Sequence, residues 1–228
     1  MLSSSINDPN TGRRRVDYRA GKFKEGRLYG EGLQSIKRAV RRLCSHEYYI
    51  DIDIQNAGPC LFVQLLVKQG IEVPHLLQLY ANDRNRVFEM IRQFLPDASD
   101  AQLKHDLLKL SHAGKPSQDG VPPLPILEAF RAQIHSVALQ LKTKPRYAEM
   151  YKARLDAKES NPLGSFISCV WQEIENIVLM CLVAFFQLLG YMVGNLAFDG
   201  LTVDKHDNPD LKGLKTTFSR KLDIGSLS

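Results

Sequence analysis

The chain has 228 residues, of which 44% are hydrophobic, and its formal net charge is +5. This composition provides enough apolar material for a buried core and excludes an intrinsically disordered chain. The four cysteines form no CxxC pair and have no histidine at zinc-ligand spacing, which argues against structural zinc and favours a reducing compartment. The first 15 residues contain no apolar stretch typical of a secretory signal, so we expect an intracellular protein.

Positive charge is concentrated near the N-terminus. Eleven Lys and Arg residues and three acids lie between positions 13 and 42, a net charge of +8, which leaves −3 for the rest of the chain. A basic segment beside a mildly acidic body is typical of a surface that contacts nucleic-acid phosphates. The alternative is that these charges are solvated and only keep the protein soluble.

The predicted elements follow a mixed α/β order. A tail over residues 1–25 is followed by an extended arm to about residue 30, a short basic helix at 32–43 and a strand at 48–54. Ser99 is the expected N-cap of the helix at 101–112, and Pro and Gly predict a loop near 114–125. Helical segments are predicted at 59–69, 74–95 (one or two helices), 101–112, 126–141 and 145–157.

Residues 177–198 form an uncharged run that is long enough to span a membrane. Polar residues and two glycines interrupt this run, and no clear Lys or Arg anchors flank it. We therefore favour a buried helix to about Leu189, a turn at Gly190 and a strand from Tyr191 to Phe198. A single-span membrane protein is the alternative that this run leaves open.

Two β-prone segments, 49–56 and 197–203, carry aspartates. Asp51 and Asp53 are two residues apart, so a strand places both on one face and its isoleucines on the other. Paired carboxylates need a neutralising cation, and Mg²⁺ suits them. The alternatives are a solvated acidic edge strand and, for Asp199, a simple hairpin turn.

The order of the motifs resembles the palm of family A DNA polymerases. Gly26-Arg27-Leu28-Tyr29 and Gly32-Leu33-Gln34-Ser35 precede the first aspartate strand, and Asp53 to Pro59 is similar to palm proteins of large DNA viruses, phages and mobile elements. The resemblance implies an α/β (α+β) fold over residues 26–205. We expect a helix-rich domain with a small antiparallel palm sheet that carries the catalytic aspartates, reduced fingers, no full thumb, and a tail or truncated segment at 206–228.

The resemblance also implies residue roles. Asp53 and Asp199 would bind two Mg²⁺ ions, with Mn²⁺ as an alternative, helped by Asp51 and the backbone carbonyl of Ile54. The sequence Phe-Asp-Gly around Asp199 lacks the second acid of family A enzymes, so either Asp51 or Asp204 would have to supply it.

The nucleotide and nucleic-acid contacts are assigned in the same way. Lys104 would contact the triphosphate, with Lys109 as its fallback, and Leu108 would stack under the base, with His112 and Arg84 nearby. The expected contacts to nucleic acid are Arg27, Gln34, Arg38, Arg42 and Gln172.

The resemblance implies a DNA polymerase that extends a primer, with DNA template-primer, nucleoside triphosphates and other replication proteins as partners and no membrane. The choice between dNTP and NTP, and between polymerase and primase, stays open because no steric-gate residue is identifiable. A non-catalytic palm-like module that binds nucleic acid within a larger replication protein is the main alternative.

Overall fold

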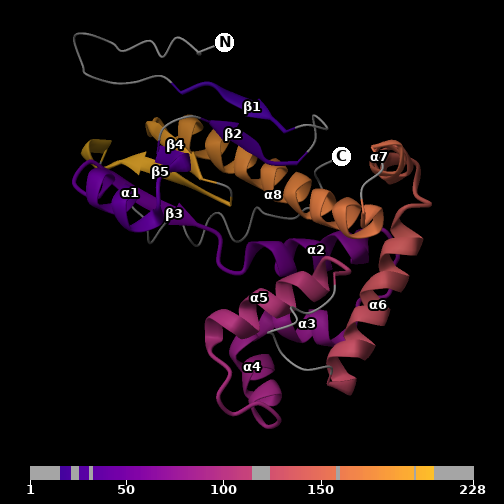
Figure 1. The fold of residues 1–228 in the computed structure, drawn as a ribbon. Coiled ribbons are helices and arrows are strands. Elements are labelled where there is room, and N and C mark those ends of the chain that lie inside the picture. Colours follow the sequence, from indigo (N-terminus) through magenta and orange to yellow (C-terminus); the bar gives the residue numbers. More distant parts are fainter. Residues whose placement is uncertain are drawn as a thin grey trace. The chain divides into compact units, whose positions relative to one another are not determined.

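The computed structural model describes residues 16–21, 26–30, 33–114, 124–157, 160–197 and 199–207. Two compact units are present: residues 1–55 with 172–228, and residues 56–171. The described part contains eight α-helices and two small antiparallel sheets, which confirms the expected α+β class (Figure 1). The predicted tails, 1–25 and 206–228, lie mostly outside the described residues.

The first unit is built on a three-stranded antiparallel sheet. Its order is β3 (Tyr49–Asp53), β5 (Gly200–Asp204) and β4 (Val193–Ala197), so β5 is central. Every residue of β5 is buried, as expected for a strand paired on both sides. A register shift between Val193 and Leu196 marks a β-bulge in the edge strand β4.

The strand β1 (Tyr18–Ala20) lies within the predicted tail, and it pairs with β2 (Leu28–Gly30) of the predicted arm in a two-stranded antiparallel ribbon. Strands of three residues are too short to show a period of two, which is why the sequence gives no sign of the pairing. A 3₁₀ turn, η1 (Leu33–Ser35), and the basic helix α1 (Arg38–Ser45) follow, so α1 begins later than expected. A second 3₁₀ turn, η2 (Lys205–Asp207), follows β5.

The helix α8 (Pro162–Leu188) supplies the apolar core of the first unit through its C-terminal half, which lies along the sheet in Figure 1. Side chains of alternate strand residues point to this helix because they share one face of the sheet. The buried cluster consists of Leu179, Leu182, Phe186, Leu196, Leu201 and Val203.

The predicted end of the apolar run is confirmed. α8 ends at Leu188, Gly190 adopts the left-handed conformation with φ of 81°, and β4 follows. Within the described residues α8 is the helix that is long and apolar enough to cross a membrane. However, 56% of its apolar 18-residue stretch is buried inside the protein. The core helix of a soluble protein can have the same length and apolar composition, so α8 is weak evidence for a membrane span.

The second unit is helical. Its core includes Phe62, Leu66, Leu77, Phe130 and Ile134, all nearly inaccessible to solvent. The elements are α2 (Ala57–Lys68), α3 (His75–Asn82), α4 (Arg84–Arg92), α5 (Asp100–Ser111), α6 (Pro125–Leu141), α7 (Pro145–Asp156) and the first ten residues of α8.

Capping residues set several helix boundaries in this unit. The side chain of Ser99 accepts a hydrogen bond from the backbone N–H of Gln102, so the predicted N-cap of α5 is confirmed. The predicted segment 74–95 contains two helices because Asp83 interrupts it. Asp83 adopts an extended conformation and caps α4 by accepting a bond from the backbone N–H of Arg86.

Candidate active site

The sheet of the first unit has one apolar and one polar face. On β3, Asp51 and Asp53 are exposed, whereas Ile52 between them is partly buried against the core. Their cross-strand partners on β5 are Thr202 and Gly200. Directly opposed residues share a face, so the polar face carries both acids as the sequence predicts.

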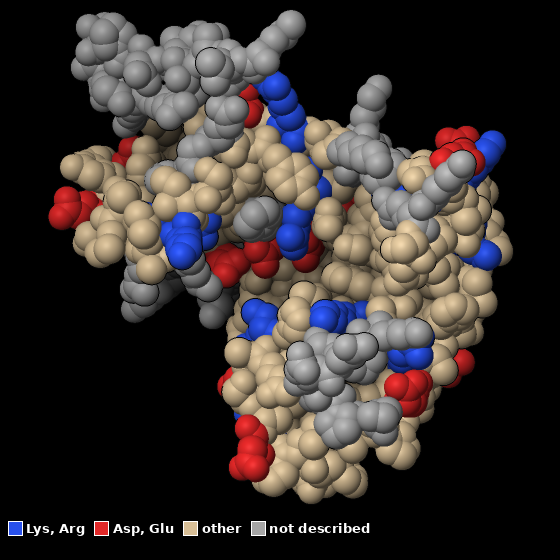
Figure 2. Space-filling view, viewed as in Figure 1, with Lys and Arg blue, Asp and Glu red and all other residues tan. Residues whose placement is uncertain are grey.

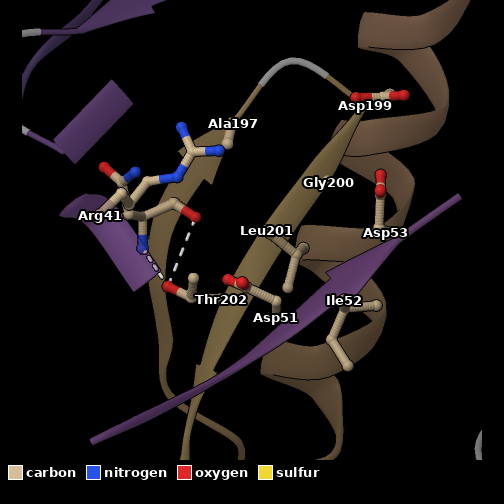
Figure 3. A pocket seen from close by; sticks show the side chains of 10 residues that line it. Arg41, Asp51, Ile52, Asp53, Ala197, Asp199, Gly200, Leu201 and Thr202 are labelled. Carbon is tan, nitrogen blue, oxygen red and sulfur yellow. Dashed lines mark hydrogen bonds between the residues drawn. The ribbon is translucent and has the colours of Figure 1, made fainter. Parts of the chain in front are cut away.

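A pocket of about 210 Å³ lies on the polar face (Figure 3). It contains Asp51, Asp53 and Asp199, three of the four aspartates that the sequence singles out near the strand ends. In the space-filling view, acidic side chains gather near the end of β3, with Lys and Arg side chains beside them (Figure 2). The lining residues are Arg41, Asp51, Ile52, Asp53, Asn195, Ala197, Asp199, Gly200, Leu201 and Thr202.

Asp53 and Asp199 reach this pocket from neighbouring strands. Asp53 is opposite Gly200, and Asp199 is the residue directly before it, in the two-residue turn that joins β4 to β5. Both carboxylates therefore lie at the same end of the strand pair, with Gly200 between them (Figure 3). The hairpin that the Asp-Gly sequence also permitted is present, and it is the element that brings Asp199 to Asp53.

The acidic side chains of the pocket are hard oxygen donors, with no thiol or imidazole among the lining residues. Within the described ranges no group of three or more His, Cys, Asp or Glu is arranged to hold a metal ion. Mg²⁺ uses one or two protein carboxylates and completes its octahedron with phosphate oxygens and water. The donor set therefore fits Mg²⁺ or Mn²⁺ better than zinc, which prefers four nitrogen and sulfur ligands.

The positions of Asp51 and Asp204 in the sheet favour Asp51 as the additional acid of the site. Asp51 lines the pocket, whereas Asp204 is at the opposite end of β5 from Gly200. Four residue steps along a strand span roughly 13 Å. Asp204 is also 96% buried and accepts a hydrogen bond from the backbone N–H of His206, so it is part of the turn after β5.

Arg41 is the cation among the lining residues. It belongs to α1 and approaches the pocket from that helix in Figure 3. Arg41 therefore adds positive charge to the lining of an acidic pocket, and a guanidinium can bind a phosphate oxygen through charge-assisted hydrogen bonds. The basic segment of the sequence thus contributes one residue, Arg41, to the lining of the acidic pocket.

A partly buried ion pair joins Arg27, directly before β2, to Glu175 on α8. Both Nε and Nη2 of Arg27 donate to Oε2 of Glu175, at 3.1 Å and 2.7 Å, and the carboxylate side chain is only 7% exposed. Burial raises the pKa of Glu175, the Arg27 guanidinium lowers it, and the Asp199 carboxylate raises it. The effect of Asp199 shows that Glu175, on α8, interacts electrostatically with an aspartate of the pocket.

The ribbon is connected to the sheet through Tyr18. Its hydroxyl donates to Oδ1 of Asn195 at 2.8 Å and accepts the backbone N–H of Leu196 at the same distance. Burial raises the pKa of Tyr18, and the bond from Leu196 lowers it. On the next strand Oγ1 of Thr202 accepts a hydrogen bond from the backbone N–H of Asn195 at 2.7 Å. This bond gives Asn195 a partner within the irregular part of β4.

The expected nucleic-acid contacts in the first unit have diverse environments. Gln34 is 93% buried, and its amide donates to Leu28 O and accepts from Gly30 N, so it holds the ribbon in place. Gln172 is half-buried on α8. Ile54 directly follows β3, and its side chain packs against the core. The side chains of Arg38 and Arg42 lie outside the described residues.

The expected nucleotide contacts belong to the second unit. Lys104 and Leu108 are exposed one turn apart on α5, as their spacing predicts. The ring of His112 packs edge-on against Trp171, with ring centroids 4.9 Å apart. The guanidinium of Arg84 lies 5.9 Å from the Phe88 ring centroid. The nucleotide-binding roles of these four residues stay predictions.

Sequence reasoning missed Glu175, Tyr18 and Thr202. A signal existed for Glu175, because it falls at helical spacing on the apolar stripe that includes Trp171 and Val178. A carboxylate on such a stripe requires a buried cationic partner. No comparable signal marks Tyr18, whose partner Asn195 is 177 positions away.

No protein family matches the chain. It is similar to a Sputnik virophage protein named "Putative helicase V13", with 30% identity over 217 residues. The alignment covers 89% of this chain and 27% of that protein, so the chain spans about a quarter of its relative. The expected relationship to viral proteins is confirmed at this level, and the resemblance to family A polymerases stays a prediction.

Proposed function

We propose that this chain is a palm-like nucleotidyltransferase that acts in viral nucleic-acid replication, with Asp53 and Asp199 as its metal-binding carboxylates. The observation that carries the proposal is that adjacent strand ends of one sheet present both acids to one pocket. Similarity to a virophage protein with a helicase name supports a replication setting. Because the chain spans about a quarter of that protein, helicase activity is not carried over to it.

The charged residues of the pocket have distinct roles in this proposal. Two Mg²⁺ ions, or Mn²⁺, would lower the pKa of the primer 3′-hydroxyl and neutralise the phosphates of the nucleotide. Asp53 and Asp199 hold these ions, and the backbone carbonyl of Ile54 is the candidate for a further oxygen ligand. Asp51 deepens the negative potential of the pocket. Arg41, which also lines the pocket, binds and orients phosphate oxygens of the nucleotide.

The second unit contributes the nucleotide-binding residues in this proposal. Lys104 neutralises the departing pyrophosphate, Leu108 supports the base, and His112 and Arg84 flank them. Lys104 and Leu108 are exposed on one face of α5, which supports their availability to a ligand. Arg27, Gln34, Arg38, Arg42 and Gln172 position the template and primer, with Gln34 acting through the ribbon that it holds.

Primer extension tests the proposal. The wild-type chain is assayed on a primed template with dNTPs and separately with NTPs, with Mg²⁺, with Mn²⁺ and with EDTA. We expect Asp53→Asn and Asp199→Asn each to lower extension more than about 100-fold, since even outer-sphere partners of metal ligands cost 10–100-fold. Nucleic-acid binding should persist in both variants. Asp97→Asn, an exposed site in the second unit, is the matched control.

A non-catalytic nucleic-acid-binding module is the second candidate. It is favoured by the Phe-Asp-Gly sequence, which lacks a second acid beside Asp199, and by the missing three-ligand cluster in the described ranges. This candidate predicts that the wild type binds a primed template but extends no primer with any metal. That result would refute the transferase proposal.

A further inference from the structure

The ribbon of β1 and β2 has two distinct faces. The cross-strand pairs are Tyr18 with Gly30, Arg19 with Tyr29, and Ala20 with Leu28. Because opposed residues share a face and successive residues alternate, Arg19 and Tyr29 lie together on the face opposite Tyr18. Arg19 is exposed and Tyr29 is 49% exposed. The outer face therefore presents an arginine and a tyrosine side by side.

The inner face anchors the ribbon. The Tyr18 hydroxyl bonds to Asn195 and Leu196 of the sheet. The Tyr18 ring also fills the space over Gly30, where an added Cβ would lie 2.7 Å from its Cε1. An isolated two-stranded ribbon is only marginally stable in water, so these anchors are what hold the outer pair in a fixed position.

Further bonds hold β2 from its two ends. Arg27, directly before β2, is ion-paired with the buried Glu175. Beyond the strand, Gln34 bonds to the backbone of both Leu28 and Gly30. None of these bonds uses Arg19, which makes no ion pair within the described part of the chain. The anchored ribbon thus keeps one cation and one aromatic ring available to a ligand.

We infer that this outer face binds single-stranded nucleic acid, with Tyr29 stacked on an unpaired base and Arg19 contacting the adjacent phosphate. The net charge of +8 between residues 13 and 42 fits a polyanion. Stacking on an aromatic ring requires a base whose face is open, which a single strand provides and a duplex interior does not. The inference rests on the proposed function for its choice of nucleic acid as ligand.

Binding without catalysis tests the inference. Fluorescence anisotropy with the full chain in EDTA compares a labelled oligo-dT with a blunt duplex of equal length. We expect Tyr29→Ala to weaken oligo-dT binding about 5- to 150-fold, the range for loss of one stacked base. Tyr29→Phe keeps the ring and should bind nearly as the wild type does. Tyr48→Ala is the control, since Tyr48 is 55% exposed and lies outside the ribbon.

Salt dependence tests the contact of Arg19. For single strands the slope of log K against log salt is negative, and it becomes less steep by about 0.7 for each phosphate contact that is lost. We expect this change for Arg19→Ala and none for Lys152→Ala, which removes the same charge from the exposed surface of α7. A normal slope for Arg19→Ala would overturn its assignment.

Two outcomes would overturn the inference as a whole: equal effects of Tyr29→Ala and Tyr48→Ala, or a wild type that prefers the duplex. Urea unfolding of Tyr29→Ala guards against misfolding, because weaker oligo-dT binding by a variant that keeps the stability of the wild type is not caused by a lost fold. The two proposals fail separately. Asp53→Asn should bind oligo-dT normally in EDTA, so loss of primer extension with intact ribbon binding concerns the aspartates alone.

Discussion

Asp53 on β3 faces Gly200 on β5, and the missing side chain at position 200 leaves space for the Asp53 carboxylate. A Cβ at this position would lie 2.6 Å from the backbone oxygen of Ile52 and 3.3 Å from Oδ1 of Asp53. The first distance involves backbone, which cannot swing aside as a flexible side chain can. Glycine is therefore required here because the two strands approach each other closely.

Gly200→Ala should separate β3 from β5 locally and displace the Asp53 carboxylate. We expect a loss of about 1–3 kcal/mol in the free energy of unfolding, the usual range for an overpacked site, and a higher Mg²⁺ concentration for half-maximal extension activity. Urea unfolding and a metal titration measure the two effects. Gly21→Ala is a suitable control, since its added methyl would meet only the Tyr29 ring at 3.4 Å. Equal stability of the two variants would contradict the packing argument.

Tyr18→Phe removes the hydroxyl that joins the ribbon to the sheet. It leaves the N–H of Leu196 without this acceptor, so we expect the free energy of unfolding to fall by about 1–3 kcal/mol. Amide hydrogen exchange should be faster in β1 and β2, because their anchor is lost. Tyr48→Phe, at an exposed tyrosine, should stay within about 0.5 kcal/mol of the wild type. Unchanged exchange in the ribbon would show that the hydroxyl is not its anchor.

Arg27→Ala leaves the Glu175 carboxylate buried without its cation. Fully buried pairs lose about 3–5 kcal/mol when one partner is removed, and we expect about 2 kcal/mol here because Arg27 is 31% exposed. Replacing both residues with methionine should recover much of the loss, since no charge then remains buried. Urea unfolding of the single and double variants measures this coupling. A double variant as unstable as Arg27→Ala would argue against the ion pair as the cause.

Glu175 should make stability depend on pH. Its folded-state pKa is raised above the ordinary 4.5, mainly by burial. Between the ordinary and the raised value the folded state binds more protons than the unfolded state, so the free energy of unfolding falls as pH rises through this window. Glu175→Gln cannot titrate, and the difference in stability between this variant and the wild type should shift in its favour as pH rises. Chemical unfolding from about pH 4 to pH 8 measures the difference. A constant difference would exclude a raised pKa.

Local patterns predicted much of the fold and part of the site. The alternation in Tyr49–Asp53 predicted one face for Asp51 and Asp53, Ser99 predicted the start of α5, and Gly190 predicted the break between α8 and β4. These features depend on side chains within a few residues of one another. The ribbon was missed because its strands contain three residues each, and α1 began later than its apolar spacing predicted.

The order of residues is enough to predict an α+β protein with aspartates at strand ends and a concentrated positive charge near its N-terminus. Helix and strand periods, caps and composition are local properties, so they can be read without coordinates. Three features depend on the folded structure: Asp51 rather than Asp204 lines the pocket, Arg27 pairs with Glu175, and Tyr18 anchors the ribbon. These contacts join residues nearly 150 or more positions apart, and strand register and helix packing select them in three dimensions.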